Sequence, residues 1–151
     1  MLVGLAFTGQ SQAQIFFSEY AEGTAGNNKY IVQLNVVDKI HAIPHTELSK
    51  TKNRILVLDN QQIPYSYLRE EFNQNSTPPP EIEQVIVIKF EDQRAGIVVD
   101  SVLGEYQAVI KPLGKFYKNQ EFISGATILG DGTISLVLDT NKIIKEVSNK
   151  K

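Results

Sequence analysis

Alternating apolar and polar positions mark the last quarter of the chain. From Thr133 to Leu138 apolar side chains recur at every second residue, which predicts a strand whose Ile134, Leu136 and Leu138 share a buried face. The preceding Asp131-Gly132 predicts a turn, because tight hairpins need the positive φ that Gly and Asp tolerate. The sequence therefore predicts a β-hairpin across residues 123–139.

A helix is expected directly after this hairpin. Asp139 can cap its first turn, and Ile143, Ile144 and Val147 recur at helical spacing. The pattern predicts a helix over residues 140–147 with one apolar stripe.

Short apolar runs separated by turn residues predict strands through most of the remaining chain. The runs at 84–90 and 95–99 are nearly continuously apolar, which favours strands that are buried on both faces. The other predicted strands cover residues 14–20, 29–34, 54–58, 61–63 and 105–110.

Two further segments show weaker helical signals. Val36, Val37 and Ile40 have helical spacing, which predicts a single helical turn. Pro64 suits the first turn of a short helix that ends at Phe72.

Many short strands with few helices favour small closed barrels, because a parallel sheet would need long crossover helices. The polar, proline-rich segment 73–80 predicts a bridge between two lobes. We expect a two-lobed domain over residues 14–151, preceded by an extension or linker remnant at 1–13. The apolar start of that extension is too short to span a bilayer, and it lacks the basic region of a secretory signal.

Composition narrows the class of protein. With 151 residues, of which 42% are hydrophobic and 21% charged, the chain can bury a core. Its formal net charge of −2 gives no electrostatic reason to expect nucleic acid or an anionic membrane. The sequence contains no cysteine, which excludes disulfides and thiolate chemistry and fits a cytoplasmic protein.

The search for catalytic or metal-binding groups gives weak candidates. His41 and His45 flank Pro44, which disfavours the helix that would bring them together as metal ligands. Glu70 and Glu71 are adjacent, so a helix points them about 100 degrees apart and they cannot face each other as an acid/base pair. We expect no metal and no cofactor.

Serine and glycine motifs are equally weak. Asp100-Ser101 has no histidine close in sequence, so a hydrolase would need a histidine from elsewhere in the fold. The glycines at 125, 130 and 132 do not open a helix with Lys-Ser/Thr, so they favour turns over a phosphate loop. Lys50, Lys52 and Arg54 are more typical of a solvated face than of a phosphate site. A β-barrel module for a small ligand or nucleic acid remains a further alternative.

Three segments, taken in order and spacing, carry a family resemblance. They are Ala95–Gly104, Gln107–Gly114 and Ile123–Asp139, and together they resemble the C-terminal regulatory domain of the chemotaxis histidine kinase CheA, which is homologous to the adaptor CheW. Lys29–Ile40 and Ile63–Arg69 resemble the family more loosely. The resemblance covers about residues 14 to 147 and is most specific after residue 93.

The resemblance implies a mainly β fold of two SH3-like five-stranded barrels packed on a shared core, with short helices that include a C-terminal one. It implies a non-catalytic scaffold that binds a CheW-type coupling protein and the cytoplasmic tip of chemoreceptors, in the cytoplasm at receptor arrays. No nucleic acid and no direct membrane insertion are expected. A free-standing adaptor that bridges receptor and kinase is the alternative.

The resemblance also suggests partner-binding residues and two departures from the adaptor pattern. Adaptors usually carry Leu-Arg-Gly where this chain has Leu58-Asp59-Asn60, and their acidic residue aligns with Lys39. We therefore hypothesise a charge-reversed surface pair of Lys39 and Asp59. Core packing is the alternative role of each apolar candidate, and accessibility separates the two. The predicted partner-binding residues are Val37, Lys39, Ile40, Ile55, Val57, Asp59, Val109 and Leu113.

Overall fold

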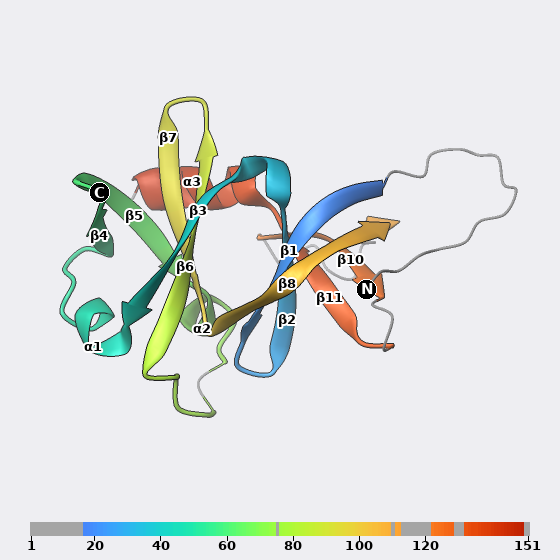
Figure 1. Ribbon diagram of the computed structural model, residues 1–151, viewed down its shortest axis with the longest axis horizontal. Coiled ribbons are helices and arrows are strands. Elements are labelled where there is room, and N and C mark those ends of the chain that lie inside the picture. Colours follow the sequence, from blue (N-terminus) through green and yellow to red (C-terminus); the bar gives the residue numbers. More distant parts are fainter. Residues whose placement is uncertain (1–16, 75, 110, 113–121, 129–131, 150–151) are drawn as a thin grey trace, which may run out of the picture.

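The described part of the chain forms two β-sheets and a few short helices (Figure 1). The computed structural model describes residues 17–74, 76–109, 111–112, 122–128 and 132–149. The six-stranded sheet contains, in spatial order, β8 (Ser101–Val109), β1 (Phe17–Ala25), β2 (Asn28–Gln33), β11 (Ile134–Leu138), β10 (Ile123–Ile128) and β9 (Lys111–Pro112). The five-stranded sheet contains β3 (Val37–Pro44), β6 (Ile82–Phe90), β7 (Gln93–Val99), β5 (Gln61–Tyr67) and β4 (Ile55–Leu58).

Helical segments are short. Among the described residues they are the 3₁₀ turn η1 (Leu34–Val36), α1 (His45–Leu48), α2 (Leu68–Glu71) and α3 (Thr140–Asn149). The prediction of a mainly β chain with two lobes and a C-terminal helix is confirmed. One sheet has six strands instead of five because the two-residue β9 extends its edge.

The chain leaves the six-stranded sheet after β2, builds the whole five-stranded sheet, and returns at β8. Most neighbouring strands are antiparallel, and each sheet has one parallel pair, β2 with β11 and β5 with β7. The predicted bridge at 73–80 is therefore not where the chain crosses between lobes, because it joins α2 to β6 beside the five-stranded sheet. It links the lobes through a contact instead: Gln74 Oε1 accepts a hydrogen bond from the Asn27 amide at the β1–β2 turn.

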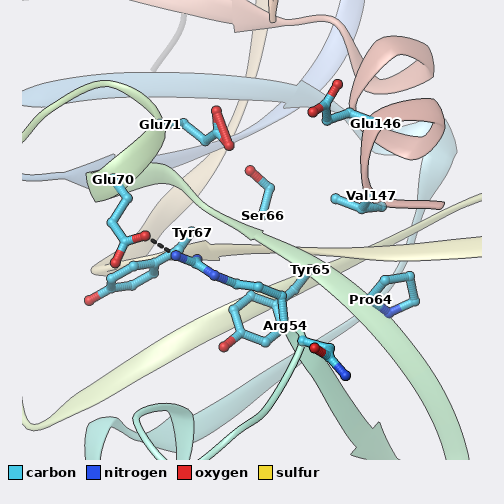
Figure 2. A pocket seen from close by; sticks show the side chains of 10 residues that line it. Arg54, Pro64, Tyr65, Ser66, Tyr67, Glu70, Glu71, Glu146 and Val147 are labelled. Carbon is cyan, nitrogen blue, oxygen red and sulfur yellow. Dashed lines mark hydrogen bonds and ion pairs between the residues drawn. The ribbon is translucent and has the colours of Figure 1, made fainter. Parts of the chain in front are cut away.

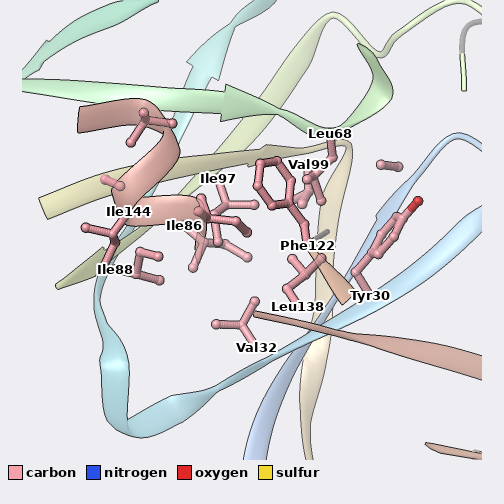
Figure 3. Close-up of a cluster of buried hydrophobic side chains, with 14 of the residues drawn as sticks. Tyr30, Val32, Leu68, Ile86, Ile88, Ile97, Val99, Phe122, Leu138 and Ile144 are labelled. Carbon is pink, nitrogen blue, oxygen red and sulfur yellow. The ribbon is translucent and has the colours of Figure 1, made fainter. Parts of the chain in front are cut away.

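Strands β6 and β7 carry the apolar core on both faces. On one face Ile86, Ile88 and Ile97 join the core that the two sheets share with α3 (Figure 3). On the other face Val85, Val87 and Val98 belong to a second buried cluster, inside the lobe that the five-stranded sheet forms. The predicted burial of both strands on two faces is confirmed, since each face meets a different cluster.

The C-terminal helix is held as its sequence predicts. Asp139 Oδ1 accepts a hydrogen bond from the Lys142 amide at 3.2 Å, which satisfies one of the free donors at the start of α3. The stripe of Ile143, Ile144 and Val147 is buried in the shared core.

One detail of the hairpin prediction is wrong. β10 and β11 pair as expected, but Ile134 is 61% exposed, whereas Ser135 and Val137 are buried. Val137 packs with Tyr20 and Ile31 in a small cluster of the six-stranded sheet. The strand is therefore buried on both faces near Leu138, whereas at its start the buried side chain is the polar Ser135. Residue 131 of the expected turn lies outside the described residues.

The predicted helical turn at Val36, Val37 and Ile40 is displaced. The turn is η1, and the two later residues belong to β3, which pairs with β6 over its whole length. Pairing with a neighbouring strand overrides the weak local preference.

Pro64 also lies in a strand and not in a helix. The Tyr65 amide donates to Arg54 O on the β4 side. Because successive amides of a strand point to opposite sides, an amide at residue 64 would point toward β7, and pairing with β7 begins only at Tyr65. A proline is tolerated there because no ladder donor is lost, and α2 begins at Leu68.

Candidate interaction surface and clefts

The hypothesised pair of Lys39 and Asp59 is present. Lys39 Nζ donates to Asp59 Oδ2 at 2.9 Å, and His41 Nε2 lies 3.8 Å from the same oxygen. This hydrogen bond and the opposite charges lower the pKa of Asp59 and raise the pKa of Lys39. Because β3 is one edge of the five-stranded sheet and Asp59 follows the other edge strand, the pair joins the two edges.

The turn that carries Asp59 has a simple backbone explanation. Asp59 and Asn60 both have positive φ, at 51° and 65°, which is the conformation of the tight turns that match the twist of a hairpin. Asp and Asn adopt it more easily than most residues.

Four apolar residues accompany this pair on the two edge strands. Val57 is 66% exposed and Ile40 41% exposed, which leaves both available to a partner. Ile55 is half-buried, and half-buried Val37 packs against the shared core, so core packing accounts for part of its area. The barrel-edge surface is the set Val37, Lys39, Ile40, Ile55, Val57 and Asp59. The side chain of Val109 and all of Leu113 lie outside the described residues.

A second ion pair lies at the seam between the lobes. Arg69 Nε and Nη2 donate to the two oxygens of Asp100 at 2.7 and 2.8 Å. Arg69 Nη1 also donates to Thr77 O at 2.6 Å, and Asp100 Oδ2 accepts from the Gly26 amide at 2.9 Å. One buried ion pair thus ties α2, segment 73–80, the β7–β8 junction and the β1–β2 turn together. The hydrogen bond to Asp100 raises the pKa of Arg69.

This network answers the hydrolase alternative for Asp100-Ser101. Asp100 is engaged by Arg69, and the Ser101 hydroxyl lies 3.3 Å from the hydroxyl of Thr24. The two histidines are engaged elsewhere, His41 beside Asp59 and His45 with Glu83. Ser101 is therefore not part of a serine–histidine arrangement.

Glu83 is a buried carboxylate that the sequence analysis missed. Its oxygens contact His45 Nδ1 at 2.7 Å and the Tyr67 hydroxyl at 2.6 Å. Burial first, then the hydrogen bond to Glu83 and its negative charge, raise the pKa of Tyr67 above its ordinary value. The available signal was a glutamate at the start of a β-branched run, where a polar residue needs partners.

Two adjoining clefts open beside these residues, and Figure 2 shows the larger one. The larger has a volume of about 490 Å³ and the smaller about 360 Å³, and they share Asn53, Arg54, Tyr65, Tyr67 and Glu70. Arg54 lies over the rings of Tyr65 and Tyr67, at 5.8 and 5.9 Å from their centroids, and pairs with Glu70. The side chain of Glu70 is 51% exposed, so this ion pair lies at the surface.

Neither a metal-binding cluster nor a membrane-spanning helix is found among the described residues. No group of three His, Asp or Glu side chains there could hold a metal ion. No helix in the same ranges has the length and apolar character needed to cross a membrane.

Two small β-lobes that share an apolar core, with polar and apolar residues on the open edge of one lobe, place the chain in the class of two-lobed β-barrel domains. A family model described as CheW-like domain matches residues 22–148. The chain belongs to the family of CheW-like domains.

Comparison with individual proteins agrees. The "Chemotaxis protein CheA" of Bacillus subtilis (strain 168) is 32% identical over 117 residues, which is 76% of this chain and 17% of that protein. The protein of the same name from Borreliella burgdorferi is 31% identical over 121 residues, or 79% of this chain and 14% of that protein. The chain therefore spans less than a fifth of the length of these relatives.

A solved structure shares the fold. The "scaffolding protein TtCheW" from Thermoanaerobacter tengcongensis superimposes with a TM-score of 0.65 at 15% identity, covering 87% of this chain and 90% of that one. At this identity the match confirms the fold of two barrel-like lobes.

Proposed function

We propose that this chain is the regulatory domain of a CheA-type chemotaxis kinase, and that it binds a CheW-type coupling protein. With that protein it docks on the cytoplasmic tips of chemoreceptors, at the membrane-associated receptor arrays. The domain acts as a scaffold, and the phosphoryl chemistry belongs to other domains of the kinase.

Sequence similarity favours the kinase over a free-standing adaptor. The relatives reported above that match in sequence are named CheA, whereas the TtCheW match is one of fold. Asp59 stands where adaptors usually carry the arginine of Leu-Arg-Gly, which argues against adaptor-type receptor binding.

The barrel-edge surface supports binding of a protein partner. Val57 is 66% exposed on β4, Ile40 is exposed on β3, and the exposed Lys39–Asp59 pair lies between these edges. Apolar residues bordered by charges are typical of protein interfaces. The exposure of Val57 beside this pair is the observation that carries the proposal.

A titration against the cognate CheW-type protein tests it. Val57→Asp introduces a charge at the most exposed apolar residue of this surface, and we expect about a tenfold or greater loss of affinity. Ile82→Asp is the matched control, since Ile82 is 58% exposed at the far end of β6 and outside the barrel-edge surface. Equal affinities for the two variants would reject the barrel-edge surface, and no association of the unmodified domain at saturating adaptor would reject the function.

The adaptor alternative has its own test. If the chain is part of a kinase, we expect the gene to encode an ATP-binding domain upstream of Met1. If the chain is a free-standing adaptor, we expect no such domain there. A pull-down with an adaptor-free CheA kinase separates them further, because a free-standing adaptor binds the kinase directly.

A further inference from the structure

Strand β4 lies at one end of the five-stranded sheet, where its neighbour is β5 (Figure 1). An end strand presents a row of N–H and C=O groups that have no strand partner, and such a row is a template for pairing with another chain. The chemistry of the row selects its occupant, because only another extended backbone matches donors and acceptors at this spacing.

The register of β4 shows which backbone groups face outward. The Tyr65 amide donates to Arg54 O at 3.0 Å. In an antiparallel pair the hydrogen-bonded residues alternate, so every second residue of β4 from Leu56 onward directs its amide toward β5. The residues between them, Ile55 and Val57, therefore direct one N–H and one C=O each away from the sheet. In the part of the chain that the structure describes, no backbone hydrogen bond joins these two residues to another element.

The opposite end strand of this sheet, β3, is protected against pairing. The His45 amide donates to Glu81 O at 2.8 Å, so the preceding residue faces away from β6. That residue is Pro44, which has no N–H to offer a further strand. β4 consists of Ile-Leu-Val-Leu and has neither a proline nor a charge, which are the devices that usually protect an edge.

The side chains of β4 indicate what kind of strand fits. Val57 is 66% exposed on one face, and half-buried Leu58 packs against the core of the lobe on the other. Arg54 before the strand and Asp59 after it both have positive φ, so the chain turns away at each end and the edge is four residues long. A short extended segment with apolar side chains on both faces therefore matches this edge.

We propose that a strand of the coupling protein pairs with the outward edge of β4 and extends the five-stranded sheet. The inference rests on the proposed function and specifies how the barrel-edge surface binds. The partner strand exchanges main-chain hydrogen bonds with Ile55 and Val57, and its apolar side chains cover Val57 and Leu58. The Lys39–Asp59 contact opens to admit it, at little cost because exposed ion pairs contribute little to stability.

Amide hydrogen exchange tests the pairing directly. It is followed by NMR on the whole chain, with and without the cognate CheW-type protein. In the complex we expect exchange at Ile55 and Val57 to slow at least about tenfold, and exchange at Leu56 and Leu58 to change little because β5 already holds their amides. A complex that leaves Ile55 and Val57 unprotected overturns the pairing and leaves the proposed function standing.

Two variants of Val57 separate main-chain pairing from side-chain contact. Val57→Pro removes the outward amide, keeps an apolar side chain and removes no hydrogen bond to β5. Val57→Ala is the matched control, because it keeps the amide and removes two methyl groups. We expect Val57→Pro to lower the affinity at least about tenfold and Val57→Ala to lower it less. Equal losses, or a larger loss for Val57→Ala, overturn the proposal. The melting temperature shows whether Val57→Pro is folded, and the exchange experiment on the unmodified chain decides if it is not.

The same exchange experiment tests who supplies the strand. If Ile55 and Val57 become protected in the chain alone, and more so at higher protein concentration, a second copy of this chain occupies the edge and the assignment to the coupling protein is overturned. If the unmodified chain does not associate with saturating CheW-type protein, the proposed function is rejected and this inference with it.

Discussion

Two ion pairs with similar contact distances occupy opposite environments in this molecule. Lys39 and Asp59 meet at 2.9 Å on the barrel edge, and their side chains are 59% and 55% exposed. Arg69 and Asp100 meet at 2.7 Å at the seam between the lobes, and theirs are 5% and 15% exposed. Water screens the first pair, whereas the second must be satisfied by protein groups alone.

The surroundings of the two pairs reflect this difference. Arg69 donates to carbonyls of segment 73–80 as well as to Asp100, and the Gly26 amide satisfies a further oxygen lone pair. Asp59 is contacted by Lys39 and approached by His41, and otherwise faces solvent. The buried pair therefore fixes how the lobes meet, while the exposed pair is free to exchange its contact for one with a partner.

Removing one member of the buried pair tests this comparison most strongly. Asp100→Ala leaves the Arg69 guanidinium buried without its carboxylate, and we expect it to lower the free energy of unfolding by about 3–5 kcal/mol. Asp59→Ala on the exposed pair should change it little. Urea unfolding followed by circular dichroism measures both. Similar losses for the two variants would contradict the assigned roles.

Gly26 is the backbone contact of the same network. Its φ is +64°, and an added Cβ would lie 2.6 Å from Gln74 Cβ, so Gly26→Ala should cost about 2 kcal/mol. Gly132→Ala is the control, since Gly132 also has positive φ but an added Cβ there meets nothing within 4 Å. The excess loss for Gly26→Ala measures the contact with segment 73–80, and thermal unfolding would detect it. Equal losses would show that this contact is loose.

The sequence predicts the local features of both regions better than their connections. Local patterns predict the β10–β11 hairpin, the Asp139 cap, the doubly buried strands β6 and β7, and the apolar stripe on α3. The Lys39–Asp59 pair followed from alignment to a family pattern. Arg69 and Asp100 carried no such signal, because an arginine in a short helix and an aspartate in a turn look ordinary until the topology brings them together across 31 positions.

Some errors have the same origin. Val37 and Ile40 were expected in a helical turn because their spacing is local, but pairing with β6 is a long-range interaction. Glu83 was missed because its partners come from α1 and β5. Prediction from local patterns succeeds where neighbours along the chain supply the contacts.

Reversing charges on the exposed pair gives a smaller effect. Lys39→Asp and Asp59→Lys each place like charges together, so each should lower the melting temperature slightly at low salt and less at high salt. The double variant restores opposite charges and should recover the original value. Thermal unfolding at about 10 mM and about 500 mM salt checks this, as the Debye length falls from about 30 Å to a few ångströms. A double variant that equals the sum of its singles would show that the contact contributes nothing.

The smallest effect concerns Glu83, a buried carboxylate whose hydrogen-bond partners are His45 and Tyr67. Burial first, and then the hydrogen bond to Glu83, raise the pKa of Tyr67 above its ordinary 10.0. Above pH 10 the unfolded chain loses the Tyr67 proton while the folded chain keeps it, so the free energy of unfolding falls as pH rises. Tyr67→Phe removes this proton, so the stability of the variant should decline less steeply between about pH 10 and 11 than that of the unmodified protein. Part of the slope remains in the variant, because burial also raises the pKa of Tyr30. Urea unfolding at stepped pH measures both slopes. Parallel curves would mean that the Tyr67–Glu83 contact opens to water in solution. Glu83 would then be exposed to solvent like the Lys39–Asp59 pair and not shielded from it like the Arg69–Asp100 pair.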